Sequence, residues 1–321
     1  YDNMCEKACS RSGIDRPIHI GKLQKFLVEQ EKEENMNFMK PGEPNGKRIA
    51  CIGAGPSSLA CARELARNGY AVTIFEANEK AGGMLTYGIL PSRLPQKVVD
   101  FDIETIRQAG VQFEFNHKVD RDELERLKKE YDAVYVGVGL WKAKDVTIPG
   151  AELSGVENAL SYLKAARNQD QDFKVGENVI VIGGGDVAMD CVSTAKQLGA
   201  NAVIVYRRTI EEAPANMEEV AAVQKMGIPI FTQFAPEEIL GENGKVTGLK
   251  AAGRDGYSSL ILKADQIVFA IGQEQTDEFA GLEKEAGVFT GGDMLYGRGR
   301  TVVEAVADGK QAAADIAEYL K

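Results

Sequence analysis

The sequence is poor in histidine and has no long apolar run. His19 and His117 lie far apart, without cysteine or acidic residues at ligand spacing, so we assign neither a metal-binding nor a catalytic role. No apolar run approaches the roughly 18 to 20 residues of a membrane-spanning helix, and no signal-peptide pattern opens the chain. We therefore expect a cytoplasmic protein that has no membrane partner.

Positive charge is also scarce, because 38 Lys and Arg residues face 48 Asp and Glu residues, for a net charge of -10. An acidic surface repels nucleic acids and anionic membranes, so neither is an expected partner. Any phosphate group must then be bound locally, by particular loops. With 321 residues, 44% of them hydrophobic, the chain has the length and apolar content for about two globular domains.

Cysteine is limited to five residues, an odd number without any C-x-x-C spacing. This pattern predicts a reducing compartment and no disulfide framework, and it weighs against a dithiol of the thioredoxin reductase type. Cys51, Cys61 and Cys191 fall at apolar positions, where buried small hydrophobic residues are expected. Cys5 and Cys9 are four residues apart, which would place both on one face of a helix.

Glycine is abundant and clustered, and one cluster follows a predicted strand over 48–52. The loop 53–58 matches G-x-G-x-x-G except at Ser58, and it leads into a predicted helix over 56–68 and a strand over 71–75. Such a loop presents bare backbone N–H groups and a helix dipole to a pyrophosphate. Because serine is larger than glycine, we expect the helix to pack slightly further from the strand.

A ribose-binding acid is expected at the end of the second strand of such a unit. Glu76 lies there, 23 residues after Gly53, where its carboxylate can accept hydrogen bonds from both ribose hydroxyls. A tight structural turn without a ligand is the alternative interpretation of the loop.

The same arrangement recurs about 130 residues later, with predicted strands over 178–182 and 202–206 and a helix over 187–198. The loop 183–188 matches G-x-G-x-x-A. Two such units predict two nucleotide-binding domains. A last strand and turn over 287–293 lead to an alanine-rich helix over 301–319.

The second unit has no acid at the end of its second strand. Arg207 and Arg208 stand there, and guanidinium groups can clamp the 2'-phosphate that an acid would repel. The pattern favours NADPH over NADH. In the alternative interpretation, both arginines are at a solvated strand end and pair with Glu211 and Glu212.

Several motifs together resemble the flavoprotein family of the glutamate synthase small subunit and the electron-input half of dihydropyrimidine dehydrogenase. They are Gly53-Ala54-Gly55-Pro56, Gly82-Gly83-Met84-Leu85-Thr86-Tyr87-Gly88-Ile89 with Arg93-Leu94-Pro95, Gly183-Gly184-Gly185-Asp186-Val187-Ala188-Met189-Asp190, Tyr206-Arg207-Arg208, and Gly291-Gly292-Asp293 with Thr301-Val302-Val303. The resemblance covers nearly the whole chain. Cys5-x-x-x-Cys9, the stretch 16–24 and Asp186 resemble most the bacterial NAD(P)-binding subunit of dihydropyrimidine dehydrogenase, with glutamate synthase small subunits a close second.

The resemblance implies an α/β fold of two nested Rossmann-like dinucleotide-binding domains after a partial helical N-terminal segment, 1–46. The FAD domain would comprise 47–147 plus 283–321, and the NAD(P)H domain 148–282. The implied FAD-binding residues are Gly53, Gly55, Pro56, Ser57, Glu76, Ala77, Gly83, Met84, Arg93, Val119, Gly139, Gly292, Asp293, Thr301 and Val302. The implied NADP-binding residues, with NAD also possible, are Gly184, Gly185, Asp186, Val187, Arg207, Arg208, Ala270 and Gly272.

The family carries iron-sulfur clusters in an N-terminal domain, and Cys5, Cys9 and Gln24 match ligand positions of 4Fe-4S centres there. Two thiolates cannot hold a four-iron cluster, which needs about four ligands. The sequence begins at Tyr1 without an initiator Met, so we expect further ligands upstream if the clusters exist. Otherwise, Cys5 and Cys9 are ordinary cysteines.

The implied function is electron input: NADPH reduces FAD, and electrons then pass to a catalytic partner subunit or domain. No catalytic side chain is assigned, because nicotinamide and flavin carry the chemistry. The alternatives are a subunit of an NADP-ferredoxin transhydrogenase and a non-catalytic NADPH sensor. One departure from the family is the short segment 273–290, where relatives have a longer extended run.

Overall fold

The computed structural model describes residues 4–34, 36, 38–168, 173–279, 281–282, 285–297, 299 and 301–321. Contacts divide the chain into an N-terminal unit, Tyr1–Lys40, and a main unit, Pro41–Lys321. The N-terminal unit holds α1 (Met4–Lys7), the short 3-10 helix η1 (Ser10–Gly13) and α2 (Ile20–Glu33), on which no residue is buried. Glu6 joins its helices, since Glu6 Oε1 accepts from the backbone N–H of Gly21 at 3.2 Å.

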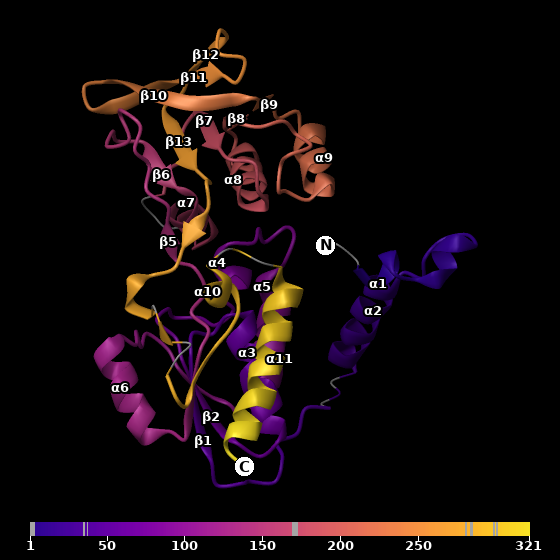
Figure 1. The fold of residues 1–321 in the computed structure, drawn as a ribbon. Helices are drawn as coiled ribbons and strands as arrows, with labels where there is room; N and C mark the ends of the chain where they lie inside the picture. Colours follow the sequence, from indigo (N-terminus) through magenta and orange to yellow (C-terminus); the bar gives the residue numbers. More distant parts are fainter. Residues whose placement is uncertain are drawn as a thin grey trace. The chain divides into compact units, whose positions relative to one another are not determined.

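The first sheet of the main unit has five parallel strands in the order β15-β4-β1-β2-β3. They are β1 (Arg48–Ile52), β2 (Ala71–Phe75), β3 (Gln112–Glu114), β4 (Ala133–Val136) and β15 (Val288–Thr290). Helix α6 (Arg121–Glu130) covers one face, and Figure 1 shows α3 (Pro56–Arg67), α5 (Gln96–Gln108) and α11 (Val302–Tyr319) on the other.

The second sheet is also parallel, in the order β6-β13-β7-β8-β9. Its strands are β6 (Val156–Asn158), β7 (Asn178–Ile182), β8 (Asn201–Tyr206), β9 (Ile230–Thr232) and β13 (Gln266–Phe269). On one face lie α7 (Ala159–Asn168), α8 (Asp186–Gln197) and α9 (Met217–Lys225). An antiparallel sheet of β10 (Phe234–Glu242), β11 (Lys245–Gly253) and β12 (Ser259–Lys263) packs on the other. Apolar side chains on both faces explain why the inner strands β7 and β13 are almost entirely buried.

Two short antiparallel strands, β5 (Lys142–Ala143) and β14 (Gln273–Glu274), join the two sheets. Lys142 Nζ pairs with Glu274 Oε1 across them at 2.7 Å. The segment after β14 contains η2 (Asp277–Phe279) and leads into β15, although residues 280, 283 and 284 lie outside the described residues. The remaining helices are α4 (Met84–Tyr87) and α10 (Asp293–Tyr296).

The nesting of the sheets follows from the chain path. Strands of the first sheet lie between residues 48 and 136 and at 288–290, while strands of the second lie between 156 and 269. One α/β unit is therefore inserted into the other. The finer boundaries at 147/148 and 282/283 stay predictions.

Candidate dinucleotide-binding sites

The first glycine loop forms an open cradle between β1 and α3. Gly53 has a φ of +87°, and a Cβ there would lie 2.9 Å from the carbonyl oxygen of Gly137, so only glycine suits this turn. A Cβ on Gly55 would meet nothing closer than 3.9 Å. Gly55 caps α3, and Pro56 occupies its first turn. The free space lies at a helix N-terminus, where backbone N–H groups can receive a phosphate.

Ser58, at the third position of the motif, is accommodated by a glycine on a neighbouring strand. The Ser58 side chain is fully buried, and its Oγ lies 3.4 Å from the carbonyl oxygen of Gly137. A Cβ on Gly137 would come within 2.4 Å of that Oγ. The missing side chain at Gly137 therefore provides the room that glycine would provide in the loop.

Glu76 closes the first cradle from the end of β2. Its side chain is buried, and its Oε2 accepts from the backbone N–H of Ala54 at 2.8 Å. Its Oε1 accepts from the backbone N–H and the side-chain amide of Asn78, at 2.8 and 2.7 Å. A carboxylate oxygen has two lone pairs, so Oε2 retains one acceptor position for a ribose hydroxyl.

A single cleft brings most of the predicted FAD residues together. Twelve predicted residues line it: Gly53, Gly55, Pro56, Ser57, Glu76, Gly83, Met84, Gly139, Gly292, Asp293, Thr301 and Val302. They come from the loops after β1 and β4, the end of β2, the start of α4, and the N-termini of α10 and α11. Segments more than 200 residues apart in sequence thus form one site.

The N-terminus of α11 is fixed by a capping box. The Thr301 side chain accepts from the backbone N–H of Glu304, whose carboxylate accepts from the backbone N–H of Thr301. Deeper in the same helix, Gly309 lies directly against the backbone of Ser57. This close approach holds Thr301 and Val302 at the edge of the cleft.

Three predicted FAD residues do not line the cleft. Ala77 is exposed, Val119 is buried in the core of the first sheet, and Arg93 forms ion pairs with the other half of the main unit. Seven lining residues were not predicted as binding residues: Ala54, Gly137, Val138, Leu140, Trp141, Gln273 and Ala305. Four of these seven, Gly137, Val138, Leu140 and Trp141, lie with Gly139 directly after β4 and form one wall of the cleft.

The second glycine loop is more tightly enclosed. A Cβ on Gly183 would lie 2.3 Å from the carbonyl oxygen of Ala270, and one on Gly184 would lie 2.3 Å from the Tyr206 ring. Gly185 caps α8, and a Cβ there would meet nothing closer than 3.8 Å. The open space again lies at a helix N-terminus, so the backbone can approach a pyrophosphate.

Three other predicted residues of the second site have different surroundings. Asp186 begins α8, and its Oδ1 accepts from the backbone N–H of Asn216 at 2.8 Å. Val187 packs against the core of the second sheet. Gly272 has a φ of +108° and faces the Lys144 side chain.

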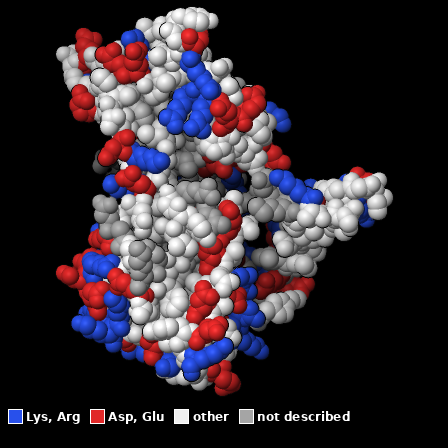
Figure 2. Space-filling model, viewed as in Figure 1, with Lys and Arg blue, Asp and Glu red and all other residues white. Residues whose placement is uncertain are grey.

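Arg207 and Arg208 are exposed after the end of β8. Within the described residues, neither guanidinium donates a hydrogen bond or joins an ion pair, and Figure 2 shows basic side chains gathered over β8 and β9. The predicted alternative, pairing with Glu211 and Glu212, is not what the structure shows. Glu212 Oε2 instead binds Arg254 at 2.7 Å, and the Thr209 N–H, followed by this contact, lowers the pKa of Glu212.

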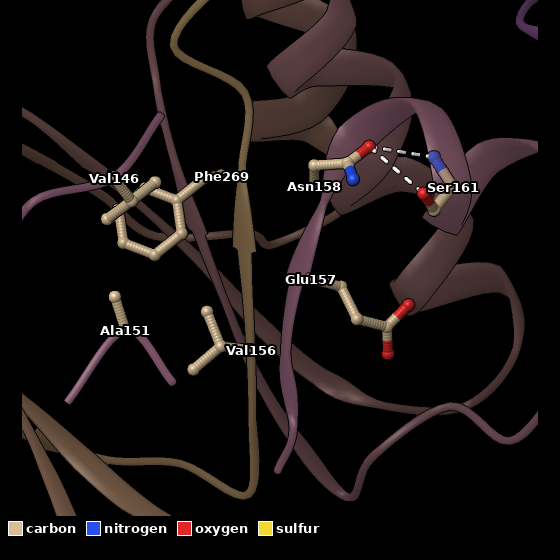
Figure 3. A pocket seen from close by; sticks show the side chains of 7 residues that line it. All are labelled: Val146, Ala151, Val156, Glu157, Asn158, Ser161 and Phe269. Carbon is tan, nitrogen blue, oxygen red and sulfur yellow. Dashed lines mark hydrogen bonds between the residues drawn. The ribbon is translucent and has the colours of Figure 1, made fainter. Parts of the chain in front are cut away.

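A separate pocket lies beside β6 and β13 of the second sheet (Figure 3). It is lined by Val146, Ala151, Val156, Glu157, Asn158, Ser161 and Phe269. Glu157 accepts from the Gln266 amide at 2.7 Å, and Asn158 accepts from the Ser161 N–H at 3.0 Å. Its polar groups thus contact their own neighbours, and none of its lining residues belongs to the predicted sites.

In the N-terminal unit, the expectation that Cys5 and Cys9 share one helix face is wrong. Helix α1 ends at Lys7, and Cys9 has an extended backbone that caps η1. Backbone N–H groups of Ile18 and Arg11 lower the pKa of Cys9. Gln24 is exposed on α2. No group of three or more potential metal ligands occurs in the described parts of the chain.

Within the residues that the structure describes, no helix combines the length and apolar character needed to cross a bilayer.

Comparison with known proteins agrees with the two-site arrangement. The family described as pyridine nucleotide-disulphide oxidoreductase matches residues 47–309. The NAD-dependent dihydropyrimidine dehydrogenase subunit PreT of Escherichia coli K12 is 37% identical over 336 residues, which covers 100% of this chain and 80% of that protein. The glutamate synthase [NADPH] small chain of Azospirillum brasilense is 32% identical over 376 residues, covering 100% and 77%.

Among solved structures, Mycobacterium tuberculosis FprA in complex with NADPH superposes with a TM-score of 0.75 at 17% identity. The match covers 87% of this chain and 85% of FprA. This likeness confirms the predicted α/β fold with two dinucleotide-binding domains.

Proposed function

Since the chain belongs to the pyridine nucleotide-disulphide oxidoreductase family and is an FAD-containing NAD(P)H oxidoreductase, we propose that it is an electron-input subunit. It takes electrons from NADPH at the second cradle onto FAD at the first, and supplies them to a partner subunit that reduces the final substrate. The observation that carries this proposal is the pair of open glycine cradles at helix N-termini in one unit, at Gly55 and Gly185.

The residues of the cleft fit FAD. The backbone N–H groups of Gly55 and Ser57 lie at the start of α3, where Gly55 has no Cβ in the way of a diphosphate, and Glu76 keeps an acceptor position for ribose. The N-terminus of α11 at Thr301 and Val302 offers positive dipole to the negative charge of a reduced flavin. When bound, FAD supplies hydride acceptance and electron transfer, and the protein contributes orientation and exclusion of water.

Preference for NADPH over NADH rests on Arg207 and Arg208. The names of the relatives divide on this point: PreT is called NAD-dependent, whereas the Azospirillum protein carries NADPH in its name. The two guanidiniums, which pair with no side chain in the described part of the chain, favour the phosphorylated nucleotide, because a 2'-phosphate accepts charge-assisted hydrogen bonds that a bare ribose cannot.

The partner is proposed from the relatives, whose names describe subunits of dihydropyrimidine dehydrogenase and glutamate synthase. Cys5 and Cys9 alone do not fit a four-iron cluster, so a 4Fe-4S centre here needs further ligands, and we derive no step through one. All five cysteines are free, which favours the cytoplasm as the compartment.

Anaerobic mixing of the FAD-loaded protein with NADPH tests the proposed function. We expect the yellow flavin absorbance to disappear, and to return when a one-electron acceptor is added. If the flavin stays oxidised in protein that binds both nucleotides, the electron-input function is refuted and an NADPH-sensing role remains. An acceptor specificity limited to ferredoxin would favour the transhydrogenase alternative.

The cofactor preference is tested with the double variant Arg207→Ala/Arg208→Ala. Losing the charge-assisted bonds to a 2'-phosphate should weaken NADPH binding by about 10- to 100-fold and change NADH binding little. The matched control is Lys225→Ala/Lys263→Ala, which removes two exposed charges from the same half of the main unit. Equal effects on NADPH and NADH would show that the arginines do not bind a 2'-phosphate.

A further inference from the structure

Arg93 connects the two halves of the main unit. It follows α4, whose first residues line the FAD cleft, and precedes α5. Its Nη1 donates to Asp190 Oδ1 at 2.6 Å, and its Nη2 lies 2.8 Å from Glu219 Oε1. One guanidinium from the first half thus binds two carboxylates of the second.

Both carboxylates lie on helices next to the second glycine loop, 183–188, which we call the second cradle. Asp190 lies one turn into α8, the helix capped by Gly185, and its side chain is only 10% exposed. Glu219 lies in the first turn of α9, just after Asn216, whose backbone N–H binds Asp186. Arg93 thus contacts α8 through Asp190 and α9 through Glu219. The start of α9 is joined in turn to the N-terminus of α8 by the hydrogen bond between Asn216 and Asp186.

A buried carboxylate such as Asp190 contributes less to packing than an apolar side chain of similar size. Burial raises the pKa of Asp190 to about 6; Arg93 opposes this shift, and the nearby carboxylates of Glu219 and Asp186 add to it. A buried ion pair is often no more stabilising than well-packed apolar residues. A role for Asp190 in orienting Arg93 explains its presence better than a role in stability.

Two further hydrogen bonds cross the same boundary. Lys164 on α7 donates to Asn78 Oδ1 at 2.9 Å, and Asn78 in turn donates to Glu76 in the FAD cleft. Arg167 on α7 donates to Gln96 at the start of α5 at 3.0 Å. The boundary is thus held by directional polar contacts, which fix orientation more closely than apolar packing does.

We propose that Arg93, Asp190 and Glu219 are positioning residues that set the two glycine cradles at the separation and angle required for electron transfer between the bound dinucleotides. This inference rests on the proposed function. Transfer between two rings is sensitive to displacements of about 1 Å, so loosening the contact should slow the reaction without removing either nucleotide.

The test is Asp190→Asn, which keeps the size of the side chain and removes its charge. We expect FAD content and the NADPH dissociation constant to stay as in wild type, while the rate of flavin reduction in stopped-flow mixing falls by about tenfold. Glu219→Gln, at a more exposed position, should give a smaller fall. Arg93→Gln should match Asp190→Asn, and the double variant should be no slower than either, because both remove the same contact.

Arg93→Lys should recover part of the rate, because an ammonium group retains one charge-assisted bond. The control is Glu237→Gln, which breaks an exposed ion pair with Lys250 within one sheet and should leave the rate unchanged.

Two results would overturn the inference. One is a wild-type rate in Asp190→Asn and Arg93→Gln, and the other is loss of FAD in Arg93→Gln alone, which would make Arg93 the FAD ligand that the resemblance implies. If Asp190→Asn fails to fold, Glu219→Gln and Arg93→Lys decide the same question. If wild-type flavin is not reduced by either nicotinamide nucleotide, the proposed function fails instead, so the two failures are distinguishable.

Discussion

Replacing Gly309 with alanine should separate α11 from α3 and thereby damage the FAD cleft. A Cβ at this position would lie 2.0 Å from the carbonyl oxygen of Ser57 and 3.1 Å from the backbone nitrogen of Cys61. Both neighbours are backbone atoms of α3, so no side-chain rotation can relieve the contact. The two helices must therefore move apart along much of their length.

The magnitude follows from two opposing terms. Overpacking a close contact costs about 1–3 kcal/mol. Alanine favours a helix over glycine by about 1 kcal/mol, which offsets part of that cost. The net loss should be up to about 2 kcal/mol of unfolding free energy. Because Thr301 and Val302 at the start of α11 line the cleft, the same movement should weaken FAD binding by about tenfold.

Urea unfolding and FAD titration of the apoprotein measure both effects. Lys310→Ala is the control, since Lys310 is exposed at the next position of the same helix. This variant tests whether any substitution at this part of α11 disturbs the cleft. It should change neither the free energy of unfolding nor the FAD affinity. A Gly309→Ala protein with wild-type stability and FAD affinity would refute the claim that this helix contact shapes the site.

Two further predictions concern single contacts. Gly137→Ala should destabilise the protein, because its Cβ would lie 2.4 Å from Ser58 Oγ and 2.8 Å from the Tyr135 ring. Adding Ser58→Gly relieves the shorter contact and should restore part of the stability; urea unfolding without any recovery in the double variant would contradict this pairing. The pKa of Asp190, raised from 3.8 to about 6, means that its ionisation costs stability as pH rises from about 4 to about 6, and the cost remains above pH 6. Asp190→Asn should therefore be more stable than wild type at pH 8, by at most about 3 kcal/mol, and equal to it near pH 4. If thermal unfolding shows the same stability difference at both pH values, the raised pKa of Asp190 is not its cause.

The two cradles could be predicted because their chemistry constrains short stretches of sequence. A pyrophosphate site needs glycines at fixed spacing between a strand and a helix, and β1, α3 and β2 lie within a residue or so of the predicted limits. The predicted family and α/β fold rest on the same motifs, and the matching family and the likeness to FprA confirm them. Cys5 and Cys9 show the limit of local spacing, because four residues place two side chains on one face only while the helix continues.

Long-range complementarity was not predictable from one sequence. Gly137 makes room for Ser58 although the two are 79 residues apart, and no local pattern marks the pair. Arg93 finds Asp190 across 97 residues, and the motif that contains Arg93 gives no sign of its partner. The first pair depends on how α3 packs against the end of β4, and the second on how the two α/β units dock; hydrophobic periodicity encodes neither.

The loop after β8 carries Arg207 and Arg208, and contacts with a distant part of the chain determine which charged partners these arginines have. Two adjacent arginines repel each other, and the nearest acidic side chains could neutralise them, but Glu212 is occupied by Arg254 and by the Thr209 N–H. Arg254 is held nearby through Gln233, whose backbone N–H donates to the carbonyl oxygen of Arg208 and whose carbonyl accepts from Arg254. The antiparallel sheet thus supplies a competitor for Glu212, and Arg207 and Arg208 pair with none of the residues that the structure describes. Repulsion between neighbouring exposed cations costs about 1 kcal/mol at most in water, and a bound 2'-phosphate would offset it.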